Sequence, residues 1–289
     1  FEDDFPYAKK VASYLNVPLH NISVKAETLY TYIEKMIYHL DEPQADPAPI
    51  NAYLISELAK KHNIKVLLSG AGGDDIFSGY RRHQALQLDS YLNFIPQSLR
   101  NKAPTISNKI NPSSALKRRL KKYLENAHLN SSERIASYFL WQAENTTHNL
   151  FTNEIQKELS KSTAIERLVN SLENIPHEHS QLNKMLYIDT KHFLTDHNLN
   201  YTDKMGMGHG VEVRVPFLDP DLVSYCAQIP PQLKQKNNTG KYILKKIASE
   251  ILPKEIIYRS KSGFGAPLRL WMNSKPFQEM KHELLNKES

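Results

Sequence analysis

Residues Leu67 to Tyr80 read LLSGAGGDDIFSGY. The apolar run of a buried strand ends at Ser69, three glycines follow within four positions, and two adjacent aspartates precede a renewed helical pattern. A turn of this kind lies at the carboxyl edge of a parallel sheet, where α/β folds bind ligands. Glycines let backbone N–H groups approach an anion, and the helix that begins near Asp75 adds its positive N-terminal end.

The two aspartates, Asp74 and Asp75, do not fit a site that binds an anion through backbone N–H groups alone. Adjacent carboxylates would repel a phosphate unless a divalent cation lay between them, and Mg²⁺ takes hard oxygen ligands of this kind. The stretch therefore indicates a metal-bridged phosphate or pyrophosphate site. A glycine-rich turn with an aspartate N-cap explains the same stretch equally well when it is read alone.

The segments before the loop predict a βαβ arrangement, and those after it are helical. Up to about residue 85, a helix at 6–15, a strand at 18–24, helices at 27–38 and 51–63 and a strand at 64–68 are typical of a parallel sheet. After that point nearly every apolar pattern has helical period. The expected helices there cover 115–126, 131–144, 154–173, 181–204, 220–228, 241–251 and 276–286.

Composition narrows the function classes. The 289 residues are 40% hydrophobic and 24% charged, values of a folded, water-soluble protein. No apolar run approaches the roughly 18 residues of a membrane span, and the single cysteine, Cys226, fits a reducing cytoplasm. The net charge is +6, but the densest basic run, 117–122, has no nucleic-acid recognition motif beside it. We therefore expect no membrane and no nucleic-acid partner.

Three long motifs resemble the synthetase domain of the asparagine synthetase family. The family's strand–loop motif, close to SGxGxDExFxGY, is matched by Ser69, Gly70, Gly72, Asp74, Phe77, Gly79 and Tyr80. A second block is similar to residues 203–219, DKMGMGHGVEVRVPFLD. A third is similar to residues 241–267, which carry the pattern Lys…Leu-Pro…Arg-x-Lys-x-Gly-Phe. The blocks occur in the family's order over nearly the whole chain.

This resemblance implies a fold and a reaction. Members of the family use ATP to adenylate a carboxylate with release of pyrophosphate, and ammonia then displaces AMP to leave an amide. It implies a cytoplasmic ATP-dependent carbon–nitrogen ligase of asparagine biosynthesis, with aspartate as the leading substrate. The expected fold is α/β: a parallel sheet of the adenine-nucleotide α-hydrolase type, incomplete at its N-terminus, and then a mostly helical half. One synthetase domain over 1–289 would divide into a nucleotide-binding portion, 1–85, and a mainly helical portion, 86–289.

The resemblance also implies roles for individual residues. Asp74 would bind Mg²⁺ on the pyrophosphate, and Lys261 would contact the phosphates during adenylation. Asp75 would hold the substrate or its amino group, and Tyr80 would do the same or simply pack. The nucleotide site would be lined by Ser69, Gly70, Gly72 and Gly73. In the second block, buried salt bridges that fix the helical part against the sheet are expected from Asp203, Glu212 and Arg214.

Three departures from the family qualify these expectations. The family's upstream pyrophosphate loop, Ser-Gly-Gly-x-Asp-Ser, is absent, and so is the glutaminase domain that supplies ammonia; the chain therefore reads as a fragment with weak activity of its own. Ala71 stands where asparagine-making members carry the carboxylate that takes a proton from ammonia, and a methyl group cannot do this. Either Asp75 or a water serves instead, or the acceptor is another carboxylate, such as a uronic acid in surface-polysaccharide synthesis. A non-catalytic nucleotide-binding homologue and a homodimer also stay open.

Overall fold

The strand that precedes the glycine loop pairs with a strand from far along the chain. In the computed structural model, β1 (Val66–Leu68) and β2 (Glu212–Arg214) form a parallel ladder with Val66 opposite Glu212 and Leu68 opposite Arg214. The structure describes residues 4–42, 44–92, 94–111, 113–142, 144–159, 161, 163–259 and 271–286. Helices dominate these residues. Together with the small parallel sheet of β1 and β2, they make the protein a member of the α/β class.

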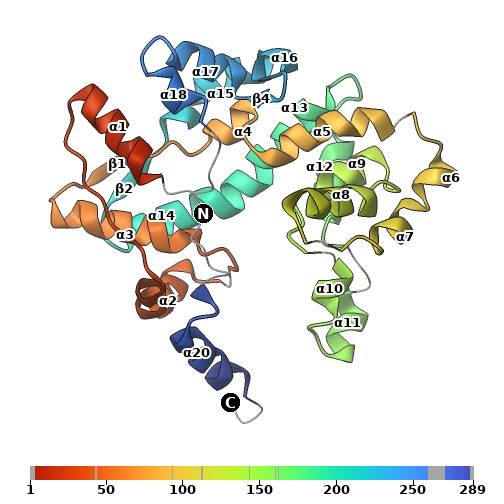
Figure 1. Ribbon diagram of the computed structural model, residues 1–289, viewed down its shortest axis with the longest axis horizontal. Coiled ribbons are helices and arrows are strands. Elements are labelled where there is room, and N and C mark those ends of the chain that lie inside the picture. Colours follow the sequence, from red (N-terminus) through yellow and green to blue (C-terminus); the bar gives the residue numbers. More distant parts are fainter. Residues whose placement is uncertain are drawn as a thin grey trace. The chain divides into compact units, whose positions relative to one another are not determined.

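The chain forms two compact units, each assembled from separate segments (Figure 1). The first unit comprises 1–72, 194–222 and 243–289, and the second comprises 73–193 and 223–242. The predicted division of one synthetase domain at residue 85 stays a prediction.

Besides β1 and β2, the described elements that lie wholly in the first unit are α1 (Phe5–Leu15), α2 (Ala26–Leu40), α3 (Ala48–Lys61), α14 (Asn200–Met207), the 3-10 turn η2 (Pro216–Leu218), α18 (Lys254–Ile257) and α20 (Lys275–Leu285). In the second unit they are α4 (Gly73–Phe77), α5 (Arg81–Leu92), α6 (Gln97–Arg100), α7 (Ala103–Ser107), α8 (Ala115–Glu125), α9 (Ser131–Ser137), α10 (Glu144–His148), α11 (Asn153–Leu159), α12 (Glu166–Glu173), α13 (Gln181–Ile188), α16 (Pro231–Lys234), β3 (Gln235–Lys236) and β4 (Thr239–Gly240). Three elements run from one unit's segment into the other's: the π-helix η1 (Asp189–Leu199), α15 (Pro220–Gln228) and α17 (Tyr242–Ala248).

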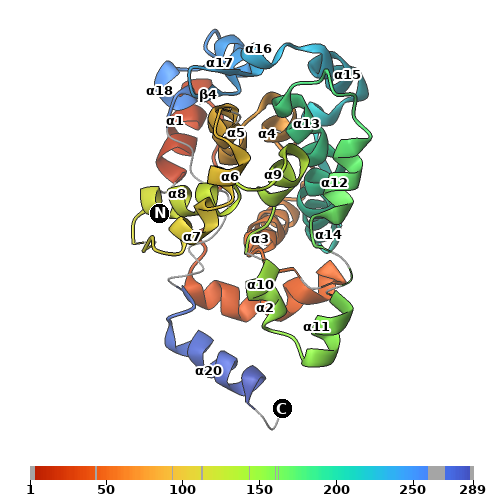
Figure 2. The ribbon, with the colours of Figure 1, turned by 90° about the vertical axis from the view of Figure 1, so that its right-hand side faces the viewer.

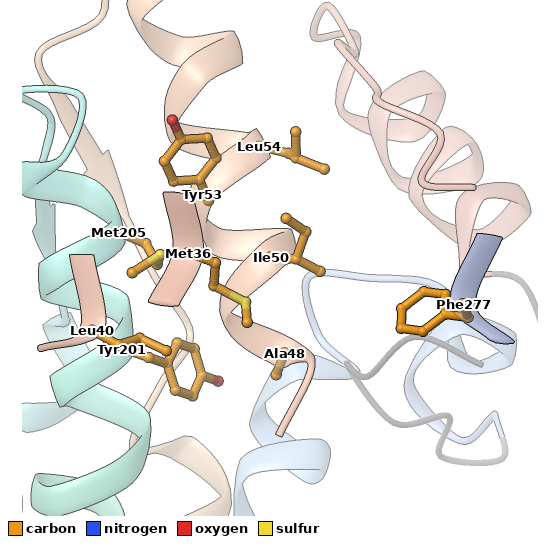
Figure 3. Packing of buried hydrophobic residues seen from close by; sticks show 9 residues of the cluster. All are labelled: Met36, Leu40, Ala48, Ile50, Tyr53, Leu54, Tyr201, Met205 and Phe277. Atoms are coloured by element: carbon orange, nitrogen blue, oxygen red, sulfur yellow. The ribbon is translucent and has the colours of Figure 1, made fainter. Parts of the chain in front are cut away.

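The core of the first unit joins α2, α3 and α14 (Figure 3). Apolar side chains recur at helical spacing on α3, where Ile50 and Leu54 are fully buried. They meet Met36 of α2 and Met205 of α14. Phe277 of α20 belongs to the same cluster. β1 follows α3 in the chain and leads into the glycine loop.

The second unit has its own core, formed by α5, α9, α12 and α13 (Figure 2). Ile135, Met185 and Ile188 are almost completely buried there. A polar network lies alongside: Arg134 Nε donates to Asp89 Oδ2 at 2.8 Å, and the hydroxyl of Tyr138 donates to Asp89 Oδ1 at 2.8 Å.

Two expectations are wrong. Residues 18–24 form no strand, because their alternating pattern finds no partner strand among the described residues, and Leu19 and Ile22 are exposed. The predicted buried salt bridges are also not formed. Glu212 and Arg214 lie on one face of β2 and pair with each other at 2.9 Å, with side chains 56% and 62% exposed, and Asp203 is exposed on α14. No described helix combines the length and the apolar character that crossing a bilayer requires.

Candidate active site

The first half of the glycine loop continues the ladder of β1. The backbone N–H of Ser69 donates to Arg214 O at 2.8 Å, and Ser69 Oγ accepts from the N–H of Ala71 at 3.2 Å. Gly72 has φ +84°, and a Cβ there would lie 2.4 Å from Leu218 Cδ2, so only glycine fits. By contrast, a Cβ added to Gly70 would meet nothing within 4 Å. The backbone of Gly70 therefore faces open space, as the approach of a ligand requires.

In the second half of the loop, Asp74 lies against Gly79. Asp74 Oδ1 is 2.9 Å from Lys241 Nζ, with the two side chains 25% and 29% exposed. A Cβ at Gly79 would lie 1.6 Å from Asp74 Oδ1 and 2.5 Å from Lys241 Cε. The missing side chain of Gly79 thus leaves the space that this carboxylate–ammonium pair occupies.

Lys241 reaches this place from the end of the β3–β4 hairpin, in which Gln235 pairs with Gly240. Its backbone N–H donates to Phe77 O at 3.1 Å, and its φ is +54°. A Cβ at Gly240 would lie 2.3 Å from Ser78 O. In the sequence, Lys241 is the first residue of the third motif, and no role is expected for it from that position. That motif was the one signal that could have found it.

Asp75 turns away from solvent and is only 1% exposed. Its Oδ2 accepts from the Tyr80 hydroxyl at 3.3 Å, and its buried Oδ1 has no hydrogen-bond partner among the described residues. Burial first, and then the negative charge of Asp189, raise the pKa of the Asp75 carboxyl to about 7. The carboxyl therefore exchanges a proton near neutral pH.

Asp189, the first residue of η1, anchors the residues next to Asp75. It is fully buried, and its Oδ1 accepts from Arg82 Nε at 3.0 Å and contacts Arg82 Nη2 as well. Its Oδ2 lies 2.6 Å from His83 Nε2. Because His83 Nδ1 accepts the N–H of Tyr80 at 3.3 Å, Nε2 is the nitrogen that donates to Asp189. Burial lowers the pKa of His83, and the hydrogen bond to Asp189 opposes this effect.

The guanidinium of Arg82 is also enclosed by aromatic rings. It lies 4.1 Å from the ring centroid of Tyr80, 4.3 Å from that of Phe193 and 4.7 Å from that of Phe139. Arg82 thereby holds the ring of Tyr80 whose hydroxyl contacts Asp75. Nothing in the spacing of the sequence relates Arg82 or His83 to Asp189, so this cluster was missed.

Of the predicted site residues, Asp74, Asp75 and Tyr80 are brought together in the second unit. Ser69, Gly70 and Gly72 belong to the first unit, and Gly73 is the first residue of the second. Lys261 lies outside the residues that the structure describes. No group of three or more possible metal ligands occurs among the described His, Cys, Asp and Glu residues. In proteins, Mg²⁺ is commonly held by one or two carboxylates together with the phosphates of the substrate, and rarely by protein ligands alone. The partly exposed carboxylate of Asp74 suits a site of the first kind.

Comparison of the sequence with known proteins identifies its family. The sequence model of the asparagine synthase family matches residues 1–289. The chain is 30% identical over 273 residues to "Asparagine synthetase [glutamine-hydrolyzing] 1" of Bacillus subtilis (strain 168), covering 93% of this chain and 41% of that protein. It is 25% identical over 307 residues to "Amidase chyE" of Penicillium rubens, covering 99% of this chain and 44% of that protein. The chain thus spans about two fifths of the length of these relatives. The full-length match of the family's model shows that this chain belongs to the asparagine synthase family.

Proposed function

We propose that this chain is the amide-forming part of an ATP-dependent ligase of the asparagine synthase type. It adenylates a carboxylate, releases pyrophosphate and passes ammonia to the activated carboxyl, with aspartate as the leading acceptor. The observation that carries the proposal is the partly exposed pair of Asp74 and Lys241 beside the glycine loop. The finer fold, a sheet of the adenine-nucleotide α-hydrolase type, belongs to the same proposal and is supported by the parallel pairing of β1 and β2.

The central difficulty of this reaction is the negative charge that develops on the leaving pyrophosphate. Fixed positive charge beside it lowers the barrier. Bound Mg²⁺ would neutralise the pyrophosphate. In the proposal Asp74 holds that ion and Lys241 offers a second positive charge at the same place. Ser69, Gly70, Gly72 and Gly73 line the nucleotide, and Lys261 contacts its phosphates.

A proton must also leave the attacking ammonia, and Ala71 cannot take it. Asp75 suits this task, since a carboxyl whose pKa is about 7 is partly ionised near neutral pH and binds a proton readily. Tyr80 holds one oxygen of Asp75, and Asp189 with Arg82 fixes Tyr80 and its surroundings. Asp75 is therefore the base that we assign to this chain.

A second candidate function keeps the adenylation and changes the acceptor to another carboxylate, such as a uronic acid. Ala71 favours it, and the similarity to a relative named an amidase fits it loosely. In both cases ammonia would come from a glutaminase domain outside this chain, in the cytoplasm. A homodimer and a nucleotide-binding role without catalysis stay open.

The test is pyrophosphate release from ATP and Mg²⁺ by the complete gene product with ammonia. Aspartate and a panel of uronic acids are offered separately. Release that depends on aspartate and yields asparagine supports the first candidate, and release with a uronic acid only supports the second. Asp74→Asn should abolish release in either case, whereas Asp221→Asn, at an exposed position of α15, should not. No release with any acceptor would contradict both candidates.

A further inference from the structure

The second unit contains a cavity of about 440 Å³ that is lined by none of the candidate site residues. Its walls come from α4, from the turn after α12, from α13 and from α15. Most of the lining is apolar and includes Ile76, Ile175, Leu186 and Val223. The volume lies within the range of sites that enclose small organic molecules.

Lys234, the last residue of α16, also lines this cavity, and a lysine is unusual in an apolar wall. The residue is only 3% exposed. Among the described residues, Lys234 forms no side-chain hydrogen bond and no ion pair. Burial lowers the pKa of its ammonium, and the titratable group closest in effect is the buried thiol of Cys226. An unpaired buried charge is costly, so a counter-ion in the cavity would stabilise the protonated lysine.

A second polar group of the cavity also lacks a partner. Asn183 on α13 lines the same space, and its buried Oδ1 makes no hydrogen bond with any described residue. The hydroxyl of Thr190, also in the lining, is already used, since it donates to Leu186 O at 2.8 Å. To one apolar space, α13 thus presents a buried amide oxygen without a partner and α16 presents a buried lysine without a counter-ion. Such groups are rare in folded proteins and require an explanation.

We propose that this cavity is a binding site for a small monocarboxylic acid with an apolar aliphatic or aryl body, whose carboxylate pairs with Lys234. The body fills the space between Ile76, Leu186 and Val223, and the amide of Asn183 takes a polar substituent or a water carried in with the acid. Binding supplies the counter-ion that Lys234 lacks, so the amine takes up a proton as the acid enters. Dicarboxylates such as aspartate are excluded, because the apolar walls offer their second charge no partner.

The site is tested by calorimetric titration of the full chain with cinnamate and hexanoate, and with cinnamamide and hexanamide as uncharged counterparts. We expect saturable binding of the acids and at least ~tenfold weaker binding of the amides, because the charge-assisted hydrogen bond to Lys234 is lost. Repeating the titration at alkaline pH in buffers with different ionisation enthalpies should show proton uptake with the acids only. The other titratable groups of the lining are the buried Cys226, whose thiol has a pKa raised by burial, and the exposed His179 and Tyr187.

Three variants decide between this site and adventitious binding. Lys234→Met should weaken the acids at least ~tenfold and leave the amides unchanged. Lys236→Met, an exposed lysine of the same segment, should change neither. Ala227→Trp, at an exposed position that lines the cavity, should block acids and amides alike without disturbing the core. Equal binding of acid and amide, full affinity in Lys234→Met, or no saturable binding by the folded chain would each overturn the proposal.

Discussion

Lys241 Nζ lies 2.9 Å from Asp74 Oδ1, directly over the backbone of Gly79. The side chains of the pair are 29% and 25% exposed, and the absent side chain of Gly79 leaves the space that they occupy. Solvent screens such a pair in part, so it contributes less to folding than a fully buried pair does. Its arrangement is better explained by what it can bind.

Asp74→Asn should therefore separate binding from stability. We expect the affinity for ATP in the presence of Mg²⁺ to fall at least ~tenfold, because the variant loses the negative charge that attracts the ion. The free energy of unfolding should change by less than about 1 kcal/mol. Calorimetric titration with and without Mg²⁺, combined with urea unfolding, checks both. Unchanged Mg²⁺-dependent affinity would remove Asp74 from the metal site.

Two glycine substitutions should have opposite profiles. Gly240→Ala places a Cβ 2.3 Å from Ser78 O, and this backbone contact should lower the free energy of unfolding by roughly 1–3 kcal/mol. Gly70→Ala meets no atom within 4 Å, so its stability should be near that of the parent, while ATP binding weakens because the methyl group occupies the open space. Denaturant unfolding and nucleotide titration of both variants test this, and equal stability losses would contradict it.

The buried pair of Asp89 and Arg134 should be far more sensitive than surface pairs. Asp89→Ala leaves the guanidinium of Arg134 buried without its counter-ion and should cost about 3–5 kcal/mol of unfolding free energy. Glu158→Ala, which breaks the exposed pair with Lys161, is the matched control and should cost less than about 1 kcal/mol. Chemical denaturation provides the comparison, and a loss in Asp89→Ala no larger than the control's would show that the network does not stabilise the second unit.

Asp75 should make stability fall as pH rises through the acidic range. Its pKa is about 7 in the folded chain, against an ordinary value of 3.8 for an aspartate, so between these values the folded state binds more protons than the unfolded state. The free energy of unfolding therefore decreases from about pH 4 to about pH 7 on account of this group and is level above that. In Asp75→Asn this contribution is absent, and the variant should be the more stable one at pH 8 by a few kcal/mol. Unfolding of both proteins at several pH values measures the difference; a difference that does not change with pH would show that Asp75 titrates normally.

The sequence was informative where the governing interactions are local. The glycine spacing, the apolar period of α3 and the strand at 64–68 are properties of short segments, and the structure confirms this helix and strand. The strand predicted at 18–24 failed because a strand needs a partner, which its own alternation does not specify. Interactions between side chains from distant segments could not be predicted from the sequence either. Asp189 acts on Arg82 and His83 across more than a hundred residues, and no pattern of period two or four links them.

The parallel ladder of β1 and β2 has a consequence for synthesis on the ribosome. When Leu68 leaves the exit tunnel, its partner strand has still to be translated, and the intervening chain includes the long segment 73–193 of the second unit. At ~5–20 residues per second, the wait between the two strands is roughly 7–30 s. During that interval β1 lacks the one partner strand that it has among the described residues, and a strand without its partner recruits other chains. Slower translation between the two strands prolongs the time for which β1 is unpaired. Chaperones that bind the nascent chain and cover β1 reduce its association with other chains.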